Sequence, residues 1–185
     1  TAAVDALSRN AKNLQALLDG DICETYSQLV KRGLDNPESL EAKKMATLLA
    51  VITTLLASTD LARRLFLVAG ISHLLEALLS LAVKHNQKEY LKSILYSAYI
   101  VSSKPNGSLP INSFFGDLVK VLIKYPVEPH IVEPALFVLV NTLQELPESA
   151  EIIGNFGACE ALGVLLANNA KSSHISDVCI QVICL

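Results

Sequence analysis

The sequence predicts an all-α solenoid, in which similar helical units stack one after another, and three observations carry this prediction. A small residue followed by apolar residues five, eight and nine positions later recurs three times, starting at Gly70, Ser113 and Gly157. The starts lie 43 and 44 residues apart, a spacing typical of helical repeats. No segment alternates convincingly between apolar and polar residues, which disfavours strands. The apolar half of the composition is mainly aliphatic, with 5% aromatic residues and no Trp, as expected for stacked helical layers.

The recurring apolar positions predict buried helix faces, because spacings of three or four place residues on one side of a helix. Glycine tolerates backbone angles that other residues resist, so Gly70 and Gly157 should mark sharp turns between two helices. Ser113 takes the place of glycine in the middle unit, where the loop ending at Pro110 could make the turn. The apolar positions are Leu75, Leu78 and Leu79, then Leu118, Val121 and Leu122, then Leu162, Leu165 and Leu166.

The N-terminal third predicts three helices before the pattern first occurs. Apolar residues at spacings of three and four predict an amphipathic helix over residues 2–18. A second helix should run from Ile22 to Gly33, since glycine commonly ends a helix. Asn36-Pro37-Glu38 suits the start of a third helix, because proline is favoured in the first helical turn. We expect that helix to continue through the apolar residues 45–57.

The remaining elements are expected in the order short helix, glycine, medium helix, polar turn and long helix. Ser58 or Thr59 should cap a short helix over residues 60–68. Residues 104–110 contain two prolines and Asn-Gly, so a long loop is expected there. The loop is not interpreted as a domain boundary, because the period continues across it. The other expected helices span residues 71–83, 88–102, 112–124, 130–145, 147–156, 158–168 and 175–185.

We expect a single domain over residues 1–185, with approximate units 1–57, 58–103, 104–146 and 147–185.

The longest run of apolar residues and threonine covers 13 residues, fewer than the roughly 20 that cross a membrane, so no membrane span is expected. The last helix is still apolar where the sequence stops and needs a covering neighbour. The chain is therefore expected to be a piece of a larger protein, or to be capped by a partner.

Charge is distributed unevenly along the chain. The net charge of −3 argues against nucleic-acid binding. Residues 125–185 hold one basic residue, Lys171, against seven acidic residues. This acidic third could attract a basic peptide. Simple solubility, or pairing with a neighbouring repeat, explains it equally well.

Cys23, Cys159, Cys179 and Cys184 have neither CxxC spacing nor nearby histidines at metal-ligand spacing. They are interpreted as small, buried apolar residues, which favours a reducing intracellular location, cytoplasmic or nuclear. No metal site and no cofactor are predicted. Because nucleophile-elbow, phosphate-loop and zinc-protease motifs are absent, no catalytic residue is assigned and the chain is not expected to be an enzyme.

The order of elements resembles the armadillo-repeat family of β-catenin and importin-α. Two segments carry the likeness, Leu67-Val-Ala-Gly70-Ile-Ser-His-Leu-Leu-Glu and Gly154-Asn-Phe-Gly157-Ala-Cys-Glu-Ala-Leu, each with a glycine before the second helix and paired leucines late in it. The segment from Ala135 to Leu143 looks like the third helix of a repeat, with an aromatic residue four positions before an asparagine. The likeness spans roughly residues 20–185 and implies a right-handed superhelix of about four repeats.

In peptide-binding members of that family, asparagines of the third helices bond a peptide backbone, while aromatic residues one turn earlier form side-chain pockets. The resemblance therefore implies partner binding at Asn141 and Phe137. The other units lack this pairing, which disfavours an importin-like mode. The alternative is that Phe137 belongs to the core and Asn141 bonds locally. Tyr96 and Tyr99 lie on another expected groove helix, and tyrosine is favoured at interaction sites, although core or rim packing is the alternative.

Lys92 belongs to a basic helix face beside the two tyrosines, with Lys84, His85 and Lys88. Such a face could attract an acidic partner, or it could simply be solvated. We expect a protein-interaction scaffold that binds a peptide or folded protein through its third helices. The alternatives are self-association, which would make it an oligomerisation or autoinhibitory domain, and regulation of a catalytic domain elsewhere in a longer protein.

Overall fold

The computed structural model describes residues 11–35, 42–88, 91–103 and 109–185 of the protein. The regular elements in these ranges are helices, with no strand among them, so the all-α prediction is confirmed. The expected start of the first helix at residues 2–10, the Asn36-Pro37-Glu38 start and the loop residues 104–108 lie outside the described residues. The helices are α2 (Ala11–Asp19), α3 (Ile22–Asp35), α4 (Ala42–Ser58), α5 (Asp60–Val68), α6 (Ile71–Lys84), α7 (Leu91–Ser102), α8 (Ile111–Lys124), α9 (Pro129–Glu145), α10 (Ser149–Asn155), α11 (Ala158–Asn168) and α12 (Ser173–Ile183).

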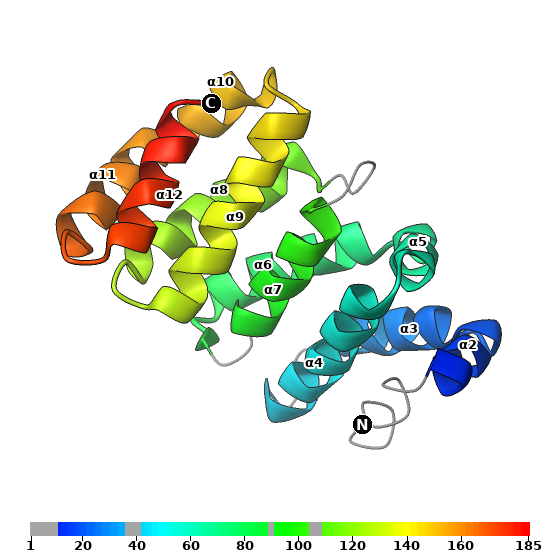
Figure 1. Cartoon of the computed structure of the whole chain (residues 1–185). Helices are drawn as coiled ribbons and strands as arrows, with labels where there is room; N and C mark the ends of the chain where they lie inside the picture. Colours follow the sequence, from blue (N-terminus) through cyan, green and yellow to red (C-terminus); the bar gives the residue numbers. More distant parts are fainter. Residues whose placement is uncertain (1–10, 36–41, 89–90, 104–108) are drawn as a thin grey trace.

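The helices stack in two rows that run the length of the molecule. One row consists of α4, α7, α9 and α12, each packed against the next, and these are the third helices of successive units. The other consists of α3, α6, α8 and α11, again packed in chain order. In Figure 1 the first row lies towards the viewer, with α6 and α8 behind it. This arrangement is a solenoid of about four helical units, as the period predicts.

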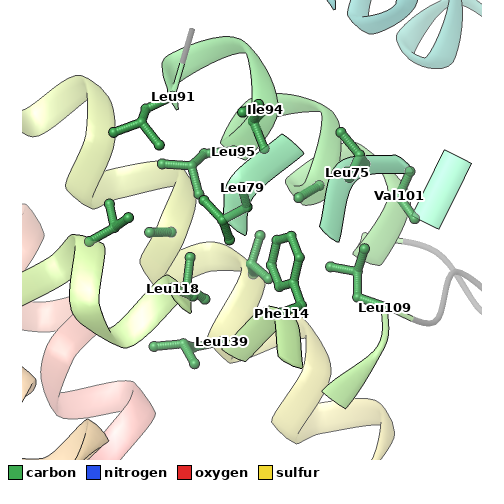
Figure 2. Packing of buried hydrophobic residues seen from close by; sticks show 14 of the residues in the cluster. Leu75, Leu79, Leu91, Ile94, Leu95, Val101, Leu109, Phe114, Leu118 and Leu139 are labelled. Carbon is green, nitrogen blue, oxygen red and sulfur yellow. The ribbon is translucent and has the colours of Figure 1, made fainter. Parts of the chain in front are cut away.

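A single apolar cluster runs between the two rows, from Leu14 near one end to Val182 near the other. Figure 2 shows its middle, where α6, α7, α8 and α9 converge through residues such as Leu79, Leu95 and Leu118. Eight of the nine recurring apolar positions are buried, and the ninth, Leu166, packs partly buried against the cluster. The recurring pattern therefore marks the side of the second helix that faces this core.

Gly70 and Gly157 make the turns that the sequence predicts. Each is the N-cap residue of the helix that follows, with φ of +81° and +87°, in the left-handed region that favours glycine. At these points the chain bends by 73° between α5 and α6 and by 71° between α10 and α11. The bend lets the short first helix lie across the layer while the second helix joins its row.

Ser113 and Gly33 both lie inside helices. Ser113 is the third residue of α8, whose N-cap is Pro110, so the turn lies at Pro110, where the sequence allowed it. The apolar positions keep their spacing, because α8 begins further ahead of its first recurring leucine than α6 and α11 do. Gly33 does not end α3, which continues to Asp35. Tertiary packing of α3 against α4, α5 and α6 outweighs the weak helix propensity of one glycine.

The junction between α4 and α5 shows the predicted cap. The Thr59 side chain accepts a hydrogen bond from the Ala62 backbone N–H at 3.1 Å. Arg63 is buried beside it, where its guanidinium donates to Asp60 at 2.7 Å and to the Leu56 carbonyl at 3.4 Å. Arg63 therefore joins the end of α4 to the start of α5.

Replacing Gly70 with alanine should lower the free energy of unfolding by about 1–2 kcal/mol, because an L-residue is strained at positive φ. A Cβ at Gly70 meets nothing within 4 Å, so the expected cost comes from the backbone. Gly163→Ala is the matched control, because Gly163 lies inside α11 with equally open space around it. It should stabilise the protein by up to about 1 kcal/mol. Urea unfolding followed by circular dichroism measures both, and equal effects would contradict the proposed strain.

Candidate functional site

The solvent-facing side of α4, α7, α9 and α12 carries all five residues assigned to partner binding, and we call it the third-helix surface. Tyr96, Tyr99 and Lys92 lie on α7, while Phe137 and Asn141 lie on α9. Tyr99, Phe137 and Asn141 are half-buried, and the side chains of Tyr96 and Lys92 are exposed. None of the five is in the fully buried core, so each can contribute surface.

Three rings form a continuous row across three successive third helices. The centroids of Tyr99 on α7 and Phe137 on α9 are 5.4 Å apart, with the ring planes tilted by 37°. Phe137 in turn lies 6.0 Å from the His174 ring on α12 at an interplanar angle of 50°. These spacings are typical of favourable aromatic pairs. We call Tyr99, Phe137 and His174 the ring row.

The structure brings Tyr99 and Phe137 together, but it does not join Tyr96 or Lys92 to them. Tyr96 is 39% exposed, which is high for a residue of its size. Lys92 lies one helical turn before it on α7, so the two side chains share a face. Within the described residues, no hydrogen bond or ring contact connects either of them to the ring row.

Asn141 forms a contact between units. Its Nδ2 donates to Ser102 Oγ on α7 at 3.1 Å, and Ser102 Oγ donates to the Tyr99 carbonyl at 3.1 Å. The neighbouring pair of helices shows a similar contact, in which Thr53 Oγ1 on α4 and Ser97 Oγ on α7 are 2.7 Å apart. The side-chain nitrogen of Asn141 is thus already used inside the protein. Its Oδ1 has no hydrogen-bond partner in the described part of the chain.

Two acidic residues accompany the ring row. Glu133 lies one turn before Phe137 on α9, so Glu133, Phe137 and Asn141 are aligned at intervals of four along one helix face. Asp177 is exposed on α12, one turn after His174. These carboxylates contribute negative charge beside the rings, and Lys92 on α7 contributes positive charge at the other side.

The turns at one edge are held by polar contacts, which include part of the expected basic face. Lys88 forms an ion pair with Glu128, and this hydrogen bond lowers the pKa of the Glu128 carboxyl. The Lys88 and Lys124 ammonium groups each lie 5.6 Å from the centre of the Tyr125 ring. Asn169 Nδ2 donates to the Pro126 carbonyl at 2.7 Å in the next turn. Lys88 therefore joins two units.

His174 is the member of the ring row that sequence reasoning missed. It lies near the start of α12, while Phe137 lies in the middle of α9 and Tyr99 lies in the last turn of α7. A search for aromatic or imidazole side chains at similar spacing on successive third helices would have found it. Tyr99, Phe137 and His174 are 38 and 37 residues apart.

The described residues contain no group of three or more His, Cys, Asp or Glu residues placed to hold a metal ion. The four cysteines are free thiols, and the expected burial is confirmed for Cys23 and Cys179 but wrong for Cys159 and Cys184, which are exposed. Burial raises the pKa of the Cys23 thiol to about 11 and also raises that of Cys179. Among the helices described, no single one has the length and apolar composition needed to cross a membrane.

Comparison with known proteins identifies the fold through structure and not through sequence. No protein-family model matches the chain. No curated protein sequence matches it either. A designed armadillo repeat protein solved in complex with the peptide (KR)4 superposes with a TM-score of 0.73 at 14% identity, covering 98% of this chain and 71% of the designed one.

Two engineered proteins solved by the Northeast Structural Genomics Consortium are also similar. The first has a TM-score of 0.73 at 16% identity and covers 97% of this chain and 70% of its own. The second has a TM-score of 0.70 at 16% identity, and the match covers 97% of this chain and 41% of the engineered one. The chain therefore has an armadillo-like repeat fold, which confirms the resemblance seen in its sequence.

The bond between Asn141 and Ser102 should be measurable as a coupling between two units. Asn141→Ala and Ser102→Ala should each destabilise the protein, and the double variant should lose less than the sum of the two. The expected coupling energy is about 0.5–1.5 kcal/mol, that of a neutral hydrogen bond. Urea unfolding of the four proteins measures it. Strict additivity would show that the contact contributes nothing to stability.

The cysteines should divide into two reactive and two protected thiols. The thiolate is the nucleophile, so exposed Cys159 and Cys184 should react rapidly with dithiobisnitrobenzoate, while Cys23 and Cys179 should react only after unfolding. Cys159→Ser and Cys184→Ser should each remove one rapid equivalent. Rapid reaction of all four thiols in the native protein would contradict the described packing.

Proposed function

We propose that this protein is a non-catalytic scaffold that binds an extended polypeptide along its third-helix surface. The observation that carries the proposal is the ring row, which spans three successive helices and remains partly open to solvent. Aromatic residues are favoured at interaction sites because they bury much surface at little cost in side-chain entropy. An armadillo-like fold with a continuous row of partly exposed rings is well suited to bind a polypeptide that runs across its helices.

The dimensions suit a short extended segment. Packed helices lie about 8–10 Å apart, so a row across three helices is roughly 20 Å long. An extended chain advances about 3.3–3.6 Å per residue, and six residues therefore cover that length. Each third helix would contact about every third residue of the bound segment. The free Oδ1 of Asn141 could accept a backbone N–H from such a segment, since its Nδ2 is already bonded to Ser102.

The charges favour a basic partner. Glu133 and Asp177 lie beside the rings, and residues 125–185 contain seven acidic residues against Lys171. Cationic side chains can also pack over aromatic faces. The designed armadillo protein of similar fold was solved with the peptide (KR)4. The intracellular location, cytoplasmic or nuclear, and the regulatory role within a longer protein remain predictions.

Binding of fluorescein-labelled (KR)4 peptide, measured by fluorescence anisotropy, tests the proposal. Tyr99→Ala removes one ring of the ring row and should weaken binding about tenfold, as expected for an interface aromatic residue. Glu133→Gln should weaken it about threefold, and Lys92→Gln should tighten it by a similar factor, because the removed charges attract and repel the peptide. Glu151→Gln on α10 is the matched control, since it removes an exposed carboxylate from a helix outside the third-helix row.

Equal weakening by Glu133→Gln and Glu151→Gln would indicate general charge attraction and would overturn the proposed surface. Unchanged binding in Tyr99→Ala would also overturn the proposed surface. Melting temperatures of the variants separate lost binding from lost folding. Light scattering across concentration identifies self-association, which would favour the oligomerisation alternative.

A further inference from the structure

A pocket of about 720 Å³ opens between α3 and α6, the first two helices of the second-helix row. Its walls therefore belong to a different row from the third-helix surface. One wall comes from α3 and the other from α6 and the turn at Gly70. A volume of this size suits a small organic molecule, since such sites commonly enclose about 300–1,000 Å³.

Small residues on α6 leave the space open. Gly70 and Ala77 line the pocket where larger side chains would fill it, and a Cβ added at Gly70 meets nothing within 4 Å. Leu34 and Leu74 provide apolar lining. The sequence thus forms a partly apolar cavity with a polar rim at a junction between units.

One of the residues that line the pocket carries an unpartnered hydroxyl. Ser27 lines the pocket on the α3 side and is only 3% exposed. Its Oγ is buried and has no hydrogen-bond partner among the described residues. A buried polar atom without a partner is costly, and native proteins rarely keep one without a reason. A ligand group that forms a hydrogen bond with Ser27 Oγ would provide the missing partner.

The charges of the lining favour an anion at one end. Lys31 and Arg32 line the pocket from the last turns of α3, and His73 lines it from the first turn of α6. Gly70, the N-cap of α6, offers no side-chain acceptor to the first amides of that helix, whose N–H groups carry partial positive charge.

Glu24 is the one carboxylate in the lining. It lies seven residues before Lys31, about 10 Å away along the helix axis. Its Oε1 accepts a hydrogen bond from Gln28 Nε2 at 3.0 Å, which holds the carboxylate along α3. Glu76, beside His73 at 3.5 Å, faces the imidazole from outside the lining. Lys31 and Arg32 therefore lie at the end of the α3 wall that is farther from Glu24.

We propose that this pocket binds a small organic anion, with its oxyanion group at Lys31 and Arg32, a hydrogen bond to Ser27, and a compact apolar body against Leu74. The carboxylate of Glu24 disfavours ligands that carry negative charge at both ends. Phosphate and carboxylate groups share the required chemistry, and an aromatic ring matches the apolar part. This site is independent of the third-helix surface and of its peptide.

Phenyl phosphate is the probe, titrated into the isotope-labelled full chain and followed by two-dimensional amide NMR. Saturable shifts should be confined to residues 24–34 and 69–77. Lys31→Gln should weaken binding roughly tenfold, because it removes a charge-assisted contact. Lys171→Gln, which removes an exposed cation from the turn between α11 and α12, should leave the affinity unchanged. Inorganic phosphate and benzyl alcohol should each bind at least tenfold more weakly than phenyl phosphate.

Ser27→Ala separates ligand binding from folding. Because the hydroxyl has no protein partner, its removal should not lower the melting temperature, and it should weaken phenyl phosphate binding about threefold or more. A lower melting temperature in Ser27→Ala would show that the hydroxyl has a structural partner and would overturn its assignment to a ligand. Absence of saturable shifts, or equal loss in Lys31→Gln and Lys171→Gln, would overturn the site. If benzyl alcohol bound as tightly as phenyl phosphate, the proposed anion recognition would be wrong. If inorganic phosphate bound as tightly as phenyl phosphate, the proposed apolar contact would be wrong.

Discussion

Every layer of this protein depends on burying its aliphatic side against the next layer. No helix here can cover its apolar face alone, and the cluster that runs from Leu14 to Val182 has no single centre. Successive helices therefore supply one another's solvent protection, as in other repeat proteins. This constraint explains why two parallel rows form and why leucines recur at fixed positions on the second helices. It also leaves a long side of each third helix facing outward, where function can vary without disturbing the core.

Polar contacts between units then determine how each unit packs on its neighbour. Apolar burial alone tolerates sliding of one layer over another, because it has little directionality. The pairs Thr53–Ser97 and Asn141–Ser102 are directional and connect adjacent third helices. At the edge, Lys88 binds Glu128, and Asn169 binds the Pro126 carbonyl. Their individual contributions are modest in water, but each specifies one register.

The two candidate sites arise from different features of the same fold. The ring row follows from stacking, because stacking places Tyr99, Phe137 and His174 side by side from three units. The pocket follows from local underfilling, where Gly70 and Ala77 leave space beside α3. One site suits an extended chain and the other a compact anion. A scaffold with both would present two independent surfaces, on its third-helix and second-helix rows.

The sequence by itself determined the helical class, the period and most helix boundaries, because these depend on local spacing of apolar residues and on the conformational freedom of glycine at Gly70 and Gly157. It also limited the cap of α5 to Ser58 or Thr59, since capping is a contact over three residues, and the structure shows that Thr59 is the cap. It did not determine that Gly33 stays helical, because packing against other helices overcomes a weak local preference. Only the tertiary structure decided that His174 joins Phe137, that Asn141 bonds Ser102, and that Ser27 lies unpartnered in a pocket. Those contacts join residues from different helices, most of them about 40 positions apart in the chain. Such residues come close together only when the helical layers stack.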